Sequence, residues 1–282
     1  MPLGSRKTKP QNPKTVGGTK LRELRRAAGL SLVDLAAKLE AELEKSVDPK
    51  HINRIESGDI KQPTAETLEA ILAGLNASYR DRRAILEAFG YNVPINLPSE
   101  QEIAVVVQLT AGDLHDATYP VCLIDFGQRL WAWNRFAPRL IGLHPDDPAT
   151  ANFLGISTVD LIFNPTVETR LLIANPEVFA PGIVHNIKVG IEPLRDQPGY
   201  RELLGQWSSF PGLIELWDIV PADMVRSVVP LKVTVPGRGM LQFRTYNAIY
   251  EADPRFELLH FAPHGAQTLR VCAEWAEEEG VL

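Results

Sequence analysis

The sequence contains little cysteine and no long apolar run. Cysteine occurs twice in 282 residues, at Cys122 and Cys272, and two thiols this far apart form neither a disulfide framework nor a metal-ligand spacing. We therefore expect the reducing environment of the cytoplasm. No apolar run reaches the 18 residues typical of a transmembrane helix, and the N-terminal stretch MPLGSRKTKPQNPKTVGGTK lacks the apolar core of a secretory signal. The sequence thus predicts no membrane partner.

The motifs of several large enzyme classes are also missing. The chain contains no GxGxxG, phosphate-binding loop, HExxH or GxSxG pattern. Its six histidines are scattered, and the run His144-Pro145-Asp146-Asp147 is more typical of a polar loop than of a metal site. Cys122 lies in an apolar segment, which favours a buried, inert thiol over a redox or flavin-adduct cysteine. We expect no catalysis, no metal and no required cofactor.

Positive charge is concentrated at the N-terminal end. The net charge is −6, yet residues 1–92 carry 16 Lys and Arg against 12 Asp and Glu, while the remaining residues carry 13 against 23. Residues 1–18 are basic and rich in Pro and Gly, which predicts a disordered arm that adds salt-sensitive affinity for nucleic acid. A basic unit joined to an acidic one is typical of a nucleic-acid reader attached to another module, although a solvated charged surface is the alternative.

Residues 19–92 contain the start and stop signals of five short helices. Gly29 suits the end of the first helix, and Ser31 can cap the second with Asp34 as its capping-box partner. Asp48 and Pro49 suit the cap and first position of a third helix. The fourth and fifth helices are expected to start near Thr64 and Ser78 and to end near Leu75 and Phe89.

The third helix has an apolar inner face and a polar outer face. Ile52 and Ile55 are expected to hold it on the core, which leaves its other side chains projecting from its N-terminal end. A helix of this kind can lie in the major groove of DNA, where Lys or Arg reads guanine and Asn reads adenine. The candidate base contacts are Lys50, His51, Asn53 and Arg54. The candidate phosphate contacts are Lys20, Arg22, Arg25 and Lys61, and for each of these eight residues a solvated side chain is the alternative.

These positions carry a family resemblance. The pattern Leu21-x2-Leu24-x4-Gly29-Leu30-Ser31-x3-Leu35-Ala36-x2-Leu39, with Ile52-x-Arg54-Ile55-Glu56-x-Gly58 and Pro63-Thr64-x2-Thr67-Leu68, resembles the phage-repressor (XRE-type) helix-turn-helix domain. The resemblance implies binding of double-stranded DNA by a homodimer. One departure is the stretch between Leu39 and Ile52, which is longer than usual and indicates an extended second helix or an enlarged loop.

The remaining chain is expected to form a linker, a connecting helix and a mixed domain. Residues 93–115 are predicted to be linker and a helix capped by Ser99. Residues 116–282 begin with a hairpin at 121–133 and a short helix capped by Asn134, followed by helices at 157–163, 166–176 and 198–217. Strands are predicted near 231–235, 240–250 and 256–261, and a last helix from Ala266. Apolar residues change parity at Arg244–Thr245, which indicates a bulge or a strand covered on both faces.

This order resembles a PAS-like sensor domain, which is a five-stranded antiparallel sheet with helices across one face. The segment YPVCLIDFGQRLWAWNRFAPRLIGL (119–143) carries that resemblance, and the whole chain is similar to MmyB-like transcription regulators. The resemblance implies an α+β protein with a small apolar or fatty-acid-like effector. Candidate ligand contacts, for most of which plain core is the alternative, are Trp131, Trp133, Phe136, Leu140, Leu161, Phe163, Phe243 and Phe261. Arg244, Tyr246 and His260 are candidates to bind an acidic head group.

Taken together, the sequence predicts a cytoplasmic, ligand-responsive, DNA-binding transcriptional regulator. Two alternatives stay open. One is a protein-interaction adaptor whose PAS-like domain dimerises or docks a partner without a ligand. The other is a sensor that holds haem or flavin, for which the purified protein would be coloured.

Overall fold

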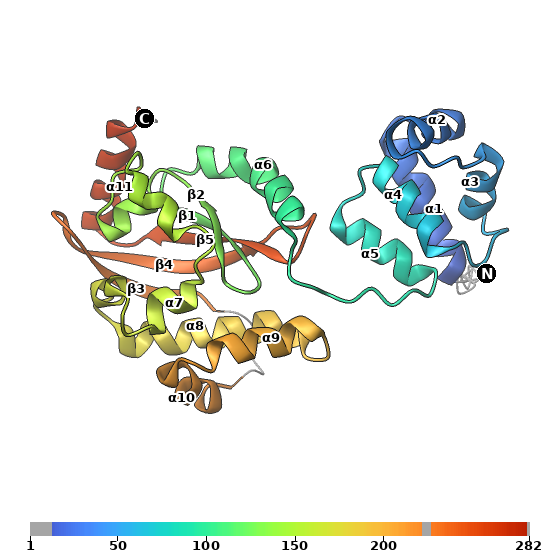
Figure 1. Cartoon of the computed structure of the whole chain (residues 1–282). Coiled ribbons are helices and arrows are strands. Elements are labelled where there is room, and N and C mark those ends of the chain that lie inside the picture. Colours follow the sequence, from blue (N-terminus) through green and yellow to red (C-terminus); the bar gives the residue numbers. More distant parts are fainter. Residues whose placement is uncertain (1–12, 222–226, 281–282) are drawn as a thin grey trace, which may run out of the picture. The chain divides into compact units, whose positions relative to one another are not determined.

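The computed structural model describes residues 13–221 and 227–280, and the chain forms two compact units (Figure 1). The first unit extends to Pro94 and includes Glu251–Asp253. The second comprises Ile95–Tyr250 and the residues from Pro254 onward. The first twelve residues of the predicted basic arm lie outside the described part of the chain. No helix among the described residues is long and apolar enough to cross a membrane.

The first unit is built from five helices around one apolar core. The predicted starts of four of these helices are confirmed by side-chain caps, because the oxygens of Ser31, Asp48, Thr64 and Ser78 each accept a hydrogen bond from a first-turn amide. The core contains Leu21, Leu35, Leu39, Ile52, Ile55, Leu68, Ile71 and Ile85. The helices are α1 (Pro13–Ala27), α2 (Leu32–Leu43), α3 (Pro49–Glu56), α4 (Ala65–Gly74) and α5 (Tyr79–Ala88).

Helix α1 begins earlier than predicted. Residues 13–18 belong to the helix rather than to a disordered arm. Gly17 and Gly18 are buried in it, and a Cβ atom on Gly18 would lie 2.6 Å from the carbonyl oxygen of Ile55. The two glycines therefore allow close approach between α1 and its neighbours, a role that sequence alone does not distinguish from flexibility.

The second unit contains one antiparallel five-stranded sheet in the order β2-β1-β5-β4-β3. The hairpin of β1 and β2 joins the meander of β3, β4 and β5 through the β1–β5 pairing. The strands are β1 (Val121–Asp125), β2 (Leu130–Trp133), β3 (Val229–Val235), β4 (Gly239–Ile249) and β5 (Phe256–Pro263). This arrangement confirms the α+β class and the predicted PAS-like sheet domain after a helical unit.

Helices lie on both faces of this sheet, whereas the sequence predicts helices across one face only, because the predicted connecting helix packs on the second face. On one face, α6 (Glu100–Asp116) packs Val106 and Leu114 against Val121, Leu123 and Phe256. The other face, called the inner face here, packs against most of the segments between β2 and β3. These segments are η1 (Pro138–Ile141), η2 (Pro148–Phe153), α7 (Thr158–Phe163), η3 (Glu168–Leu172), α8 (Pro176–Ile191), η4 (Glu192–Leu194), α9 (Pro198–Trp207) and α10 (Pro211–Ile219).

Two helix predictions for this segment were wrong. The range 166–176 holds only the short η3, and the long helix is α8, which the sequence reading missed because Pro181 and Gly182 interrupt its pattern. Gly182 faces Val229, whose Cγ1 would lie 2.7 Å from an added Cβ. The predicted helix 198–217 is divided into α9 and α10 between Trp207 and Pro211.

Strand β4 is regular, so the predicted bulge is absent. Its pairing with β3 and with β5 runs from Gly239 to Ile249 without a shift in register. Leu241, Phe243 and Thr245 are buried at alternating positions along the strand. The apolar residues switch from odd to even positions because both faces of the sheet are covered. Tyr250 packs on the second face, against the cluster that α6 forms with Val121, Leu123 and Phe256.

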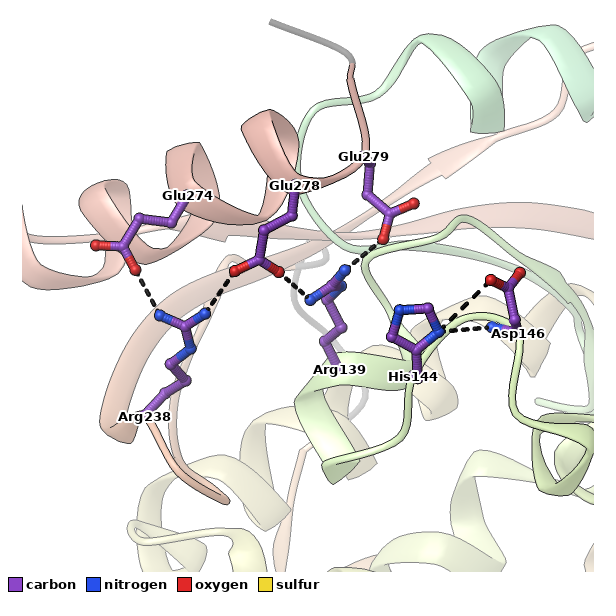
Figure 2. A network of polar contacts seen from close by, with 7 residues as sticks. All are labelled: Arg139, His144, Asp146, Arg238, Glu274, Glu278 and Glu279. Atoms are coloured by element: carbon purple, nitrogen blue, oxygen red, sulfur yellow. Dashed lines mark hydrogen bonds and ion pairs between the residues drawn. The ribbon is translucent and has the colours of Figure 1, made fainter.

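Helix α11 (Ala266–Glu278) closes the unit and is held by a network of ion pairs (Figure 2). Glu278 lies between two arginines, with its carboxylate 2.7 Å from Nη1 of Arg139 and 2.8 Å from Nη2 of Arg238. Arg139 also pairs with Glu279, and Arg238 Nη1 lies 2.5 Å from Glu274. Because Arg139 belongs to η1 and Arg238 to the β3–β4 turn, the network ties three segments together.

Candidate DNA-binding surface and internal cavity

Helix α3 is placed as the sequence predicts. The Asp48 carboxylate accepts a hydrogen bond from the Lys50 amide at 2.7 Å, and Pro49 occupies the first helical position, so the helix begins abruptly. Ile52 and Ile55 are 0% exposed and hold it on the core. The outer face is consequently formed by the polar residues before and between them.

Most of the outer side chains of α3 are exposed to solvent. Lys50, Asn53 and Arg54 are exposed and His51 is half-buried. Within the described part of the chain, the side chains of Lys50, Asn53 and Arg54 have no hydrogen bond or ion pair. Cationic and amide groups that project together from a short helix can read base edges in a major groove, and their role as base contacts remains a prediction.

Behind this face, a buried carboxylate joins α1 to α3. Both Glu56 oxygens accept hydrogen bonds from Arg25, at 2.7 Å from Nε and 2.9 Å from Nη2, and Arg22 Nε lies 3.2 Å away. Arg25 also donates to the Leu30 carbonyl oxygen at 2.8 Å. The hydrogen bond to Glu56 raises the pKa of Arg25. The sequence did not reveal Arg25 as the partner of Glu56, because the two residues lie 31 positions apart.

The predicted phosphate contacts therefore separate into two groups. Arg25 is 9% exposed and its guanidinium is hydrogen-bonded to Glu56. The prediction that Arg25 contacts phosphate is therefore wrong. Arg22 is half-buried and shares that carboxylate. Lys20 and Lys61 are exposed, and their contacts with phosphate stay predictions.

The long connection before α3 is part helix and part loop. Helix α2 ends at Leu43, and Glu44 takes a left-handed conformation with φ of 51°. Lys45 then forms an exposed ion pair with Glu66 of α4 at 2.5 Å. The stretch between Leu39 and Ile52 thus forms the last turn of α2, a loop and the start of α3.

The second unit contains a partly open cavity of about 160 Å³ between the inner face of the sheet and the helices. Its walls are mainly apolar. The sheet contributes Cys122, Leu130, Leu231, Val233 and Leu259, the turn before η1 contributes Ala137, and the helices contribute Ile141, Ile162, Phe179, Ile183 and Ile187, among others. Burial raises the pKa of the Cys122 thiol to about 12, so this thiol is neutral in the cavity wall.

The predicted ligand contacts fall into two groups. Trp133, Leu140, Leu161 and Phe261 line the cavity. Phe136 and Phe243 are fully buried core residues outside its lining, and Phe163 packs against the same core from its edge. Trp131 points away, because its indole nitrogen donates to the Asp125 carboxylate at 3.0 Å.

The three candidate head-group residues lie on the opposite face of the sheet from the cavity. Arg244 and Tyr246 alternate with Thr245 and Asn247, which line the cavity, and His260 lies between two lining residues of β5. The Tyr246 and His260 rings stack at 4.8 Å. The prediction that Arg244, Tyr246 and His260 bind a head group inside the cavity is therefore corrected.

This outer cluster also includes Tyr119. Its hydroxyl lies 3.4 Å from both the Tyr246 hydroxyl and Nδ1 of His260. Burial, followed by the hydrogen bond with Tyr246, raises the pKa of Tyr119 to about 12. Burial lowers the pKa of His260, and the nearby Asp113 carboxylate opposes that shift.

Sequence reading missed the polar groups of the cavity wall. They are Gln128, Thr158, Thr169, Asn186, Thr245 and Asn247. Thr245 and Asn247 continue the alternation of Leu241 and Phe243, so an unbroken β4 would have identified them. Gln128 is held in a left-handed conformation with φ of 62° at the turn between β1 and β2. Among the described residues, no group of three or more His, Cys, Asp or Glu is placed to hold a metal ion.

Comparison with known proteins gives direct evidence for the identity of the first unit. A family model described as a helix-turn-helix domain matches residues 18–86. We therefore assign the N-terminal unit as a helix-turn-helix domain. A search of curated proteins finds no match.

A solved structure described as an RNA-binding light-oxygen-voltage receptor is 15% identical to this chain, with 93% of this chain and 68% of that chain covered. The TM-score is 0.25, which does not establish a common fold. The PAS-like description of the second unit depends instead on the observed order of its strands and helices.

Proposed function

We propose that this protein is a ligand-responsive, DNA-binding transcriptional regulator of the XRE type with an MmyB-like sensor domain. The observation that carries the proposal is the outer face of α3, where three unpaired polar side chains project beside two buried isoleucines in a helix-turn-helix domain. Such a helix reads the major groove, and two copies of the chain would read half-sites one helical turn apart. A homodimer on double-stranded DNA is therefore proposed.

The proposed reading of DNA can be tested by selection from genomic fragments followed by sequencing. The full chain is expected to enrich a palindromic site, and Arg54→Ala should weaken binding to that site by about tenfold, since one good base contact contributes about 1–3 kcal/mol. Arg83→Ala is the matched control, because Arg83 lies in α5 and pairs with Glu87. Equal binding to the selected site and to random DNA would refute the proposal.

The proposed sensor is the cavity of the second unit. An apolar pocket with a few polar groups is the usual form of a small-molecule site, and this one lies between the sheet and the helices that precede β3. A small apolar or fatty-acid-like effector is proposed. It would act through α6, which packs on β1 from the other face and follows the segment that leaves the DNA-binding unit.

The sensor proposal can be tested by mass spectrometry of the denatured purified protein. A co-purified small molecule, released on denaturation and absent from an Ala137→Leu variant that narrows the cavity, is the expected result. Absence of any such molecule, together with no response to added ligands, would count against the sensor.

A second candidate function is protein interaction through the PAS-like domain. It is favoured by α6, whose Val105 and Leu109 are 56% and 60% exposed on adjacent turns of the same side. In this case the domain dimerises or docks a partner and the cavity is plain core. Val105→Asp would then abolish association of the chain, while the cavity variant Ala137→Leu would change neither association nor DNA binding.

A further inference from the structure

One side of helix α6 carries large apolar side chains that the second unit does not cover. Val105 and Leu109 are 56% and 60% exposed, whereas Val106 and Leu114 on the other side of the helix pack against the sheet. Val105, Leu109 and Asp113 follow one another at intervals of four residues, so they form one ridge along the helix, called the α6 ridge here. Asp113 adds an exposed carboxylate to the two apolar side chains.

An uncovered part of the sheet lies on the same face as α6. Val121, which α6 covers, is paired with His260, and His260 is paired with Tyr246, so these three side chains point to one face. Further along that face, Arg244 of β4 and its partner Pro230 of β3 are exposed. An open hollow, called the β3–β4 hollow here, is lined by Val228, Pro230, Arg244, Tyr246 and Ala262.

The α6 ridge and the β3–β4 hollow are neighbours on this face. The Asp113 carboxylate lies close enough to His260 to oppose the lowering of the His260 pKa by burial. The His260 ring stacks on Tyr246 at 4.8 Å, and Tyr246 lines the hollow. The ridge, the two rings and the hollow therefore form one continuous surface of apolar and charged groups, which is typical of an interaction site.

The ridge and the hollow carry opposite charges that are not paired within the chain. Among the described residues, neither Arg244 nor Asp113 forms a hydrogen bond or an ion pair. Residues 93–282 carry 13 Lys and Arg against 23 Asp and Glu, so an exposed and unpaired arginine in this unit is available for an acidic partner. The ridge offers such an acid beside two apolar side chains, which match the apolar lining of the hollow in character.

We infer that the α6 ridge of one copy packs into the β3–β4 hollow of a second copy, where Asp113 pairs with Arg244 of the other copy. Because the ridge and the hollow face the same side of the unit, a two-fold axis between them forms this contact twice. Val105 and Leu109 are then covered by the apolar residues of the hollow. The inference rests on the proposed homodimer and names the surface through which it forms. The contact does not use the lining of the cavity, so it is compatible with a ligand there.

Reversal of charge on each side tests the contact in the full chain. Sedimentation velocity without DNA, over a range of protein concentrations, measures the association, and the unaltered chain is expected to form a dimer. Arg244→Glu and Asp113→Arg should each weaken the association by about tenfold or more, because each reversal places like charges together at both symmetric contacts. Both side chains are exposed, so circular dichroism should show the fold of the unaltered chain.

The double variant that carries both reversals is the decisive sample. It restores opposite charges across the contact and should recover most of the affinity that each single variant loses. Leu109→Gln, which changes no charge, should also weaken the association because it removes an apolar contact. Arg270→Glu is the matched control, since Arg270 is exposed on α11 and its reversal changes the net charge by the same amount.

The outcomes separate the inference from the function on which it rests. Unchanged association in both single variants, or a double variant as weak as the single ones, would overturn the inference while leaving the homodimer in place. An equal effect of Arg270→Glu would show a general effect of net charge and would also overturn it. A chain that stays monomeric at every concentration would overturn both the inference and the homodimer, whereas DNA reading is judged separately by the genomic selection.

Discussion

Glu56 shows how one buried side chain can shape a surface that it does not reach. Its carboxylate is held by Arg25 and by the half-buried Arg22, so α1 and α3 are joined behind the exposed face of α3. Removing one partner of a buried pair leaves the other charge uncompensated. The positions of Asn53 and Arg54 therefore depend on a residue that faces the opposite way.

We predict that Glu56→Gln lowers the free energy of unfolding of the helix-turn-helix unit by about 3 kcal/mol, because the two arginines lose their shared carboxylate. Chemical denaturation followed by circular dichroism measures the change. Glu66→Gln is the control, since Glu66 forms an exposed pair with Lys45 and its loss should have no measurable effect. Equal effects of the two substitutions would contradict this account of Glu56.

His260 gives stability a dependence on pH. Burial lowers its pKa in the folded chain, although Asp113 opposes the shift, so the unfolded chain takes up a proton more readily. The free energy of unfolding should then be fully retained above the ordinary histidine pKa of 6.5 and should fall as the pH drops below it.

We expect His260→Phe, which keeps a ring beside Tyr246, to lose part of this dependence. Urea denaturation at about pH 7.5 and about pH 5.5 would compare the two chains. A variant that loses as much stability on acidification as the unaltered chain would show that His260 does not contribute.

Glycines decide how closely helices pack in the first unit. A Cβ on Gly18 would approach the carbonyl oxygens of Ile55 and Glu56 to 2.6 and 2.7 Å, and these backbone atoms can yield only if α1 and α3 separate. Gly112 in α6 has no atom within 4 Å of such a Cβ. The same residue type therefore has opposite meanings in two helices.

Gly18→Ala is predicted to destabilise the chain by about 2 kcal/mol through overpacking. Gly112→Ala should instead stabilise it by up to about 1 kcal/mol, because alanine has the higher helix propensity. Thermal denaturation of both variants tests the contrast. Stabilisation by both substitutions would mean that α1 does not approach α3 as closely as described.

The ion-pair network of α11 acts on a wall of the cavity. Arg139 belongs to η1, which also carries the lining residues Leu140 and Ile141, and it pairs with Glu278 and Glu279 (Figure 2). Desolvation by itself raises the pKa of Glu278, but the hydrogen bonds and charges of Arg139 and Arg238 together outweigh it, so the pKa is lowered. The position of η1 is thereby linked to the C-terminal helix.

We expect Arg139→Gln to increase amide hydrogen exchange in the last turns of α11 and in η1 together, since both lose the same contact. Arg270→Gln, on the exposed side of α11, should leave exchange in η1 unchanged. Faster exchange in α11 alone would show that η1 is held by its apolar contacts rather than by the network.

The molecule as a whole joins a helix-turn-helix unit to a unit with a partly open cavity. If a ligand of the cavity changes the affinity for DNA by some factor, DNA must change the affinity for that ligand by the same factor. Such coupling requires that the ligand favour one arrangement of the chain over another.

The small molecule that co-purifies with the chain serves as the probe of this coupling. We predict that it changes the affinity for the enriched DNA site between about 5- and 150-fold, and that the DNA changes its binding by an equal factor. Fluorescence anisotropy with labelled DNA measures the change in DNA affinity, and calorimetry with the small molecule measures the change in its affinity. Tight binding of the probe with no change in DNA affinity would show that the occupied cavity does not regulate this domain.

Much of the fold follows from local chemistry. The capping residues Ser31, Asp48, Thr64, Ser78 and Ser99 predict where their helices begin, because they satisfy free amides within one turn. The periodicity of Ile52 and Ile55 likewise determines which side of α3 is outside. The exposed face of α3 could thus be predicted, whereas the burial of Arg25 could not, because its partner Glu56 is distant in sequence.

The cavity could not be predicted in the same way. Its lining combines turn, strand and helix residues whose proximity depends on the pairing of β1 with β5 and on the placement of α8. The sequence by itself determined the helical caps, the apolar stripes and the outward face of α3, because these depend on neighbours within one or two turns. Only the tertiary structure decided that Arg244, Tyr246 and His260 lie across the sheet from the cavity, because the strand parity that directs them depends on partners far along the chain.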